Sequence, residues 1–218
     1  MLINLLGCDG AGKSTQMREL LPWLEARIGK KVATITKKDA LNRDEYPEAR
    51  YISSNYRMLM YDILPEMRAE SRAMFIFNLF AIQICQRPPQ QGTVLFLDGG
   101  WQKHVATEAA LGLDETWLNN LVSFFPHVDL TLFLDVRPDV ILSWRKENDE
   151  VHAPYECGNQ PVCSDDAFLN HMKKVYGILK RQASSNNWII INGERDAGTV
   201  LADLKSVIHE YLQRHPLC

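Results

Sequence analysis

Short runs of consecutive apolar residues recur along the chain, separated by stretches in which apolar residues return every three or four positions. An uninterrupted apolar run predicts a strand buried on both faces, which is typical of a parallel sheet covered by helices on either side. The strands expected from these runs are 2–6, 32–36, 93–98, 129–135 and 188–192. The pattern therefore predicts an α/β fold built on a parallel sheet.

Apolar residues at helical spacing predict helices between these strands. The expected helices are 13–28, most of 48–87, 101–110, 114–124, 137–146, 166–183 and 197–213. A turn rich in proline and glutamine is expected at 88–92, and residues 147–164 lack apolar periodicity, so they should form an exposed excursion between two helices. The chain shows no linker composition, so we expect a single domain spanning 1–218.

The first apolar run leads into a glycine-rich segment that reads Gly-Cys-Asp-Gly-Ala-Gly-Lys-Ser-Thr. Its glycines allow positive φ angles, so that backbone N–H groups can surround phosphate oxygens at the start of a helix. Lys13 adds a charge for the β- and γ-phosphates, and the Ser14 hydroxyl is the expected Mg²⁺ ligand. The residues expected to form this phosphate loop are Gly7, Asp9, Gly10, Ala11, Gly12, Lys13, Ser14 and Thr15.

The composition is that of an ordinary globular protein and narrows the choice of partners. The 218 residues carry a formal net charge of −3, which provides no basic surface of the kind that nucleic acid requires. No apolar stretch reaches the length of a membrane span, and the first strand follows Met1 directly, so we expect a cytoplasmic protein without membrane contact. Five cysteines without a framework spacing indicate reduced thiols.

Residues 7–16 resemble the phosphate loop of the thymidylate kinases, which has an acid at its third position and a glutamine after its two hydroxyl residues. The likeness continues at 97–98, 106–113 and 133–140 and in the C-terminal third, so it covers nearly the whole chain. It implies a P-loop nucleoside-monophosphate kinase with three layers, a five-stranded parallel sheet flanked by helices, and a lid at about 147–164 that closes over ATP. It also implies phosphoryl transfer from ATP to a nucleoside monophosphate, with dTMP as the leading acceptor.

Phosphoryl transfer depends on positioning and on cations around the γ-phosphate. Ser14 and Asp98 are the expected surroundings of Mg²⁺, although Asp98 at a strand end could instead cap the next helix. Some thymidylate kinases carry a loop arginine where this chain has Gly10, so the closing cation must come from elsewhere. Arg145 and Lys146 are the candidates, and an ordinary solvated helix end is the alternative for both.

The acceptor side departs from the family pattern, because Asp98-Gly99-Gly100 stands where the family has Asp-Arg-Tyr. The arginine that would meet the acceptor phosphate is therefore missing, and no arginine lies in the apolar helix 74–86 for thymine recognition. The glycines vacate volume, and Lys37 or Lys103 could replace the lost charge. In the family the loop acid holds the 3′-hydroxyl of the acceptor, so Asp9 should face that side. The expected acceptor-binding residues are Asp9, Lys37, Phe75, Gly99, Lys103 and Glu108; for Phe75, a place in the core is the alternative.

Several alternatives stay open at this point. The acceptor could be a modified pyrimidine nucleotide, a nucleoside or a small metabolite, and the chain could also be an ATP-binding switch without catalysis. His152, Cys157, Cys163 and His171 suggest a zinc site, although they lack a closely spaced cysteine pair. The sequence leaves the oligomeric state open, with a homodimer as one option.

Overall fold

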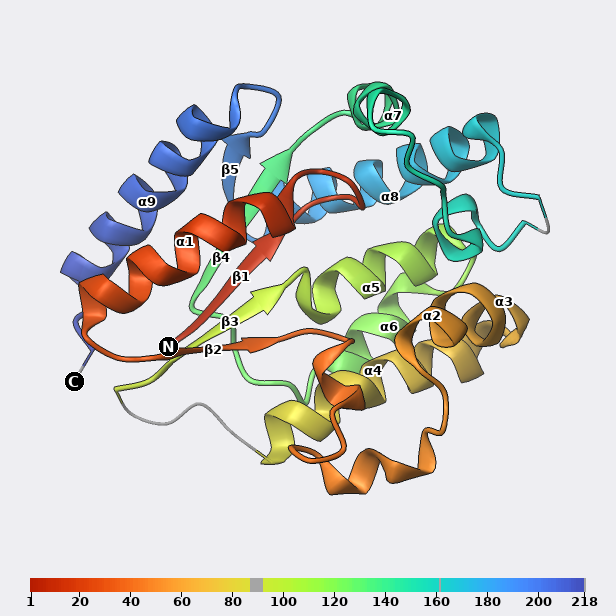
Figure 1. Ribbon diagram of the computed structural model, residues 1–218, viewed down its shortest axis with the longest axis horizontal. Coiled ribbons are helices and arrows are strands. Elements are labelled where there is room, and N and C mark those ends of the chain that lie inside the picture. Colours follow the sequence, from red (N-terminus) through yellow and green to blue (C-terminus); the bar gives the residue numbers. More distant parts are fainter. Residues whose placement is uncertain (87–91, 161, 218) are drawn as a thin grey trace.

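The computed structural model describes residues 1–86, 92–160 and 162–217, and it contains one five-stranded parallel sheet (Figure 1). The strands are β1 (Leu2–Leu6), β2 (Val32–Ile35), β3 (Val94–Asp98), β4 (Leu130–Asp135) and β5 (Ile189–Asn192), in the spatial order β2-β3-β1-β4-β5. The predicted parallel α/β sheet is confirmed. The turn expected at 88–92 lies, except for Gly92, outside the described residues.

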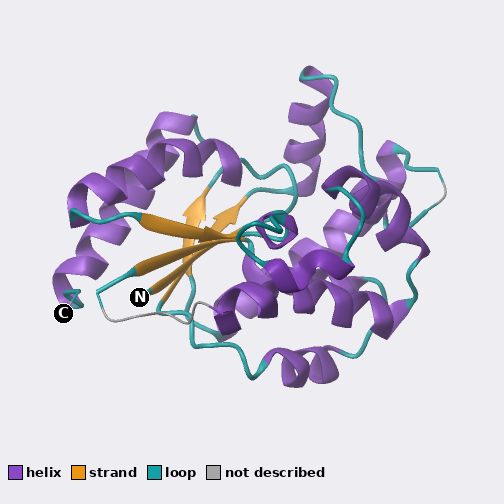
Figure 2. Cartoon of the chain, turned by 60° about the horizontal axis from the view of Figure 1, so that its bottom comes forward, coloured by secondary structure: helices purple, strands orange, loops and turns teal. Residues whose placement is uncertain are grey.

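Long helices cover both faces of this sheet, as Figure 2 shows. The long helices are α1 (Lys13–Ile28), α4 (Ala69–Gln86), α5 (Gly100–Ala110), α6 (Glu115–Val122), α7 (Pro138–Glu147), α8 (Asp165–Ser185) and α9 (Ala197–Arg214). On one face, Leu24 of α1 and Leu204 of α9 pack with Leu132 of β4. On the other face, α4 and α5 pack over β3, and α8 packs over β4. The three central strands β1, β3 and β4 are therefore buried on both sides, which explains their uninterrupted apolar sequences, whereas the edge strands β2 and β5 keep exposed residues.

The segment between β2 and α4 is less regular than the helical stretch expected over 48–68, whereas α4 confirms the second half of that stretch. It consists of short helical turns: η1 (Asp39–Leu41), η2 (Pro47–Tyr51), α2 (Tyr56–Met58), η3 (Leu59–Ile63) and α3 (Leu64–Glu66). Prolines stand at the first turns of η2 and α3, and the Asn55 side chain caps α2 by accepting a hydrogen bond from the Met58 N–H at 2.9 Å. Frequent starts of this kind prevent one continuous helix.

The strand order places the end of β1 where ligands bind in open parallel sheets. From β1 the chain passes to β2 and β3 on one side and then crosses to β4 and β5 on the other, so the carboxyl ends of the strands open into a crevice. The glycine-rich loop follows β1, Thr36 and Lys37 follow β2, and Asp98 ends β3. Within the described residues, no helix combines the length and apolar composition needed to cross a membrane.

Candidate active site

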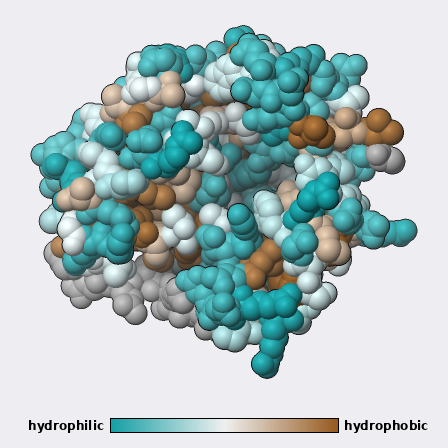
Figure 3. All heavy atoms as spheres, viewed as in Figure 1, coloured by the Kyte–Doolittle hydropathy of each residue, from teal (hydrophilic) through white to brown (hydrophobic). Residues whose placement is uncertain are grey.

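A cleft of about 730 Å³ lies at the carboxyl ends of β1, β2 and β3. Its walls come from the phosphate loop, the segment after β2, α2 and η3, the start of α5, the end of α7 and the short turn η4 (Pro154–Cys157). Figure 3, in the view of Figure 1, shows a hollow near the middle of this face with mostly hydrophilic residues around it. Segments far apart in the sequence therefore meet at one polar depression.

The phosphate loop has the backbone shape that its glycines allow. Gly10 and Gly12 both have φ near +85°, and α1 begins immediately afterwards at Lys13. A Cβ on Gly10 would lie 2.6 Å from Ile141 Cγ2 and 3.0 Å from Arg145 Nε, so only glycine fits there. The loop side chains that line the cleft are those of Asp9, Lys13, Ser14 and Thr15, whereas Ala11 is buried in the core.

The donor side of the cleft carries one ammonium group and two oxygen ligands. Lys13 folds over the loop, and its Nζ donates to the carbonyl oxygens of Gly7 at 3.1 Å and Cys8 at 2.9 Å. Ser14 is exposed, and the half-buried Asp98 makes no hydrogen bond or ion pair with any described residue. Gly99, not Asp98, caps α5, so the capping alternative for Asp98 is wrong. A hydroxyl and a free carboxylate are ligands that suit Mg²⁺.

Asp9 and Lys103 form a close ion pair on the acceptor side of the loop. Lys103 Nζ lies 2.5 Å from Asp9 Oδ1 and 2.6 Å from Oδ2, and a quarter of the Asp9 side chain is exposed. Burial disfavours the ionised carboxyl, yet the Lys103 ammonium outweighs it and holds the pKa of Asp9 well below its usual range. The charge of Lys103 is therefore already neutralised by this partner.

Lys37, by contrast, has no anionic partner among the described residues. Its Nζ lies 3.7 Å from Met60 Sδ and 5.4 Å from the centre of the Tyr155 ring. Burial, with the nearby Lys103 ammonium, lowers the pKa of Lys37 to about 8. Of the two lysines expected to replace the missing arginine, only Lys37 has a positive charge available to a ligand.

Three residues expected on the acceptor side do not line the cleft. Glu108 is fully buried and pairs with Arg72 of α4, and Phe75 packs against the core. The space beside Gly99 is occupied by the aliphatic stem of Lys103, which lies 3.4 Å from the ideal Cβ position of the glycine. The expectation of vacated volume at Gly99 is therefore wrong. Glu108 turns inward because α5, which carries it, packs on α4.

Sequence reasoning missed several residues that do line the cleft, chiefly Tyr56, Met60, His104, Trp144 and Glu156. His104 is 2% exposed, its Nδ1 has no hydrogen-bond partner, and burial holds its pKa well below the usual range, so the imidazole is neutral near pH 7. The one sequence feature that could have pointed to His104 is its position next to Lys103. Tyr56, Met60 and Glu156 belong to irregular segments without a local pattern, and Trp144 lies on the predicted helix α7.

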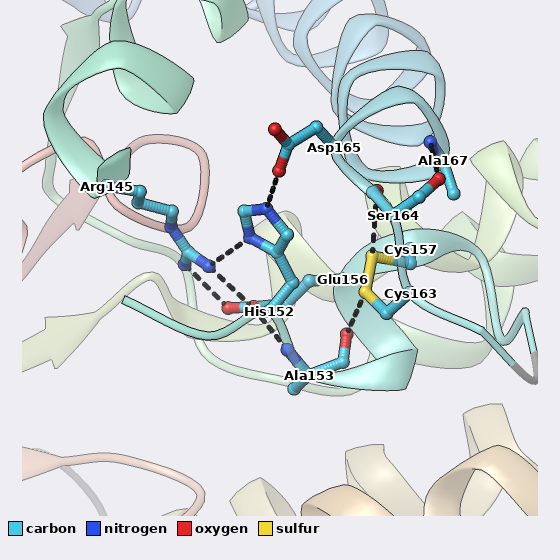
Figure 4. Close-up of a disulfide and its surroundings, with 9 residues drawn as sticks. All are labelled: Arg145, His152, Ala153, Glu156, Cys157, Cys163, Ser164, Asp165 and Ala167. Atoms are coloured by element: carbon cyan, nitrogen blue, oxygen red, sulfur yellow. Dashed lines mark hydrogen bonds and ion pairs between the residues drawn. A yellow bond between two sulfur atoms is a disulfide. The ribbon is translucent and has the colours of Figure 1, made fainter. Parts of the chain in front are cut away.

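Arg145 reaches the cleft from the end of α7. It is 7% exposed, so the solvated helix end proposed as its alternative is wrong, whereas Lys146 is exposed and pairs with Asp165 at 2.7 Å. Arg145 Nη1 and Nη2 donate to the two oxygens of Glu156, each at 2.9 Å (Figure 4). Its guanidinium thus lies beside Gly10, where some thymidylate kinases carry a loop arginine.

Cys157 and Cys163 form a disulfide, which corrects the expectation of reduced thiols throughout (Figure 4). The chain turns at Gly158, whose φ is +71°, and brings the two Cα atoms to 5.5 Å. Cys8 and Cys85 are free. Because the disulfide consumes both thiols, the zinc alternative loses its sulfur ligands, and the described residues contain no group of three or more His, Cys, Asp or Glu that could hold a metal.

Comparison with known proteins agrees with this arrangement. No protein-family model matches the chain. A probable thymidylate kinase of Sulfolobus acidocaldarius is 23% identical over 212 residues, covering 97% of both chains. One of Methanosphaera stadtmanae is 24% identical over 220 residues, covering 98% of this chain and all of the other. The chain is therefore similar to thymidylate kinases over nearly its whole length.

The fold of the chain also resembles that of a solved structure. Deoxyadenosine kinase from M. mycoides with bound dATP superposes with a TM-score of 0.62 at 14% identity, covering 96% of this chain and 100% of the other. At that identity the match supports the fold alone, a parallel sheet with flanking helices. The chain departs from the thymidylate kinase pattern at Asp98-Gly99-Gly100.

Proposed function

We propose that this protein transfers the γ-phosphoryl group of ATP to a nucleoside monophosphate, with dTMP as the first acceptor to test. The observation that carries the proposal is a single cleft with a phosphate loop on one wall and the unpaired ammonium of Lys37 on another. Its relatives' names, thymidylate kinase and deoxyadenosine kinase, point to the same reaction class. ATP and the acceptor would then meet between the two walls.

On the donor side, the loop N–H groups and Lys13 would bind the β- and γ-phosphates. Ser14 and Asp98 would hold Mg²⁺, which neutralises phosphate charge when bound. Arg145 would contact the transferring group from above Gly10. A phosphate oxygen of the acceptor attacks the γ-phosphorus, the bond to the bridging oxygen breaks, and ADP leaves. Catalysis by these residues is positioning and charge stabilisation.

On the acceptor side, Lys37 would bind the phosphate of the monophosphate and Asp9 a sugar hydroxyl, with Lys103 keeping Asp9 ionised. A carboxylate accepts hydrogen bonds only, which suits a hydroxyl donor. The segment 147–164 carries Glu156 and the disulfide and would act as the lid.

The function is tested by Mg²⁺-dependent ADP release with a panel of nucleoside monophosphates, nucleosides and an ATP-only control. Turnover with a monophosphate, led by dTMP, supports the proposal. Turnover with nucleosides alone would move the activity to the alternative acceptor class, and a panel that never exceeds the control would reject the kinase assignment. Light scattering on the same preparation checks whether the chain forms a homodimer.

The pH dependence of acceptor use should report Lys37. Because its pKa is about 8, the free protein loses this charge as the pH rises through that value, and kcat/KM for the monophosphate should fall by about tenfold per pH unit beyond it. In Lys37→Arg the guanidinium stays charged, so this fall should disappear. A flat wild-type profile, or an identical fall in Lys37→Arg, would contradict the role of Lys37.

Asp9→Asn should weaken recognition of the sugar without weakening ATP binding. The amide keeps the shape of the carboxylate but loses its charge, so both the Lys103 contact and the hydroxyl contact weaken. We expect a higher acceptor KM, and a 3′-deoxy acceptor should lose less in Asp9→Asn than in the wild type. Thermal unfolding of both proteins controls for the unpaired lysine. Equal losses for the two acceptors would show that Asp9 does not bind the sugar.

A further inference from the structure

Arg145 is held in a defined orientation by one carboxylate. Both terminal nitrogens of its guanidinium donate to Glu156, a two-bond geometry that fixes the plane as well as the position of the group. Its Nη1 also lies 3.1 Å from His152 Nδ1, and its Cζ lies 4.7 Å from the centre of the Phe168 ring. Figure 4 shows Arg145 and Glu156 turned toward each other, with His152 beside them.

One nitrogen of this guanidinium has no hydrogen-bond partner among the described residues. Arg145 Nε is buried and has no hydrogen-bond partner, and the nearest other carboxylate oxygen, from the exposed Glu150, stands 3.8 Å away. The same Nε lies 3.0 Å from the ideal Cβ position on Gly10, so it faces the phosphate loop. A buried N–H without a partner is costly unless a ligand satisfies it.

Glu156 is itself fixed by its two neighbours in η4. The Tyr155 hydroxyl donates to Glu108 Oε1 at 2.9 Å in the core, and Cys157 is bonded to Cys163. Glu156 Oε2 also accepts from the Ala153 N–H at 2.9 Å. Three consecutive residues therefore join the turn to the core, to Arg145 and to Cys163, which leaves the carboxylate little freedom to move.

We propose that Glu156 is the positioning residue for Arg145: it occupies both terminal nitrogens so that the Nε–H points at the phosphates bound by the loop, while Glu156 itself touches no substrate. This inference rests on the proposed function, because it assumes a triphosphate at the phosphate loop. Glu156 therefore acts only through Arg145, and that dependence makes the role testable. Removing the Glu156 carboxylate should therefore have no further effect on turnover in a variant that already lacks the Arg145 guanidinium.

The test compares the wild type, Glu156→Gln, Arg145→Ala and the double variant. The amide of Glu156→Gln offers one acceptor oxygen where the pair with Arg145 needs two. We therefore expect Glu156→Gln and Arg145→Ala each to lower kcat on the order of 10²-fold at unchanged acceptor KM. The double variant should be no slower than Arg145→Ala. Glu147→Gln removes the same charge from an exposed position on α7 and should match the wild type.

A binding measurement keeps this inference separate from the proposed function. By calorimetry, the preference of the wild type for a non-hydrolysable ATP analogue over ADP should fall equally in Glu156→Gln and Arg145→Ala, and this requires no acceptor. If no acceptor turns over, the proposed function fails while this ratio still decides the role of Glu156. An unchanged ratio in Glu156→Gln, a raised acceptor KM, or an additional loss in the double variant would overturn the inference. If Glu156→Gln unfolds, Glu156→Asp replaces it in the test. The aspartate keeps the ion pair but moves the carboxylate back by one methylene, and this variant should still have a lower kcat than the wild type.

Discussion

Lys13→Ala is expected to lower turnover by about 100- to 1,000-fold, because it deletes a preorganised cation at the β- and γ-phosphates. Lys13 Nζ donates to the carbonyl oxygens of Gly7 and Cys8, so the ammonium is held at the loop by its own backbone. The alanine opens no large cavity in the core, since the side chain lies over the loop at the cleft. ADP release in the presence of Mg²⁺ and the best acceptor of the panel measures the loss.

The control for this variant is Lys173→Ala, which removes the same charge from an exposed position on α8. Both variants should unfold at temperatures close to that of the wild type, and only Lys13→Ala should lose activity. If Lys13→Ala produced ADP at the wild-type rate, the phosphate-loop mechanism would be wrong.

Glu108→Gln is expected to lower the free energy of unfolding by about 3–5 kcal/mol, because it leaves a buried guanidinium without its counter-charge. Arg72 Nε and Nη2 donate to Glu108 at 2.8–3.1 Å, and both side chains are at most 7% exposed. The Tyr155 hydroxyl completes the cluster by donating to the same carboxylate. Denaturant unfolding at neutral pH measures the difference.

A second comparison separates the ion pair from simple packing. Arg72→Met leaves the Glu108 carboxylate unpaired and should destabilise the fold to a similar extent, whereas the double variant Arg72→Met/Glu108→Gln removes both charges and should be more stable than either single variant. A double variant whose loss equals the sum of the single losses would show that the two charges do not depend on each other.

Much of the fold could be predicted because its signals are local. Five apolar runs became five strands, and two of the three glycines of the phosphate loop, Gly10 and Gly12, stand where the backbone has positive φ angles. Residues 48–68 were predicted less well, because short turns begun by prolines and capped by Asn55 leave no repeating apolar pattern, whereas α4 confirms the helix expected after them. The local sequence therefore predicts helices and strands better than it predicts the irregular connections between them.

The candidate site divides in the same way. The phosphate-loop residues could be found by spacing alone, and Asp98 by its place at a strand end. Nothing in the spacing could distinguish Lys37 from Lys103, because the difference is an ion pair between residues 94 positions apart. Glu108 was assigned to the acceptor for the same reason: its partner Arg72 lies on another helix, 36 positions earlier.

By itself, then, the sequence determined the parallel sheet, the phosphate loop and the likeness to thymidylate kinases, since these depend on neighbouring residues and on patterns repeated along one strand or helix. Only the tertiary structure decided which charged side chains are neutralised by a partner and which remain available to a ligand. Packing neutralises Lys103 with Asp9, buries Glu108 against Arg72 and turns Arg145 toward Gly10 through Glu156. A charge is worth little to a ligand once a buried partner neutralises it, and partners distant in sequence meet only when the chain has folded.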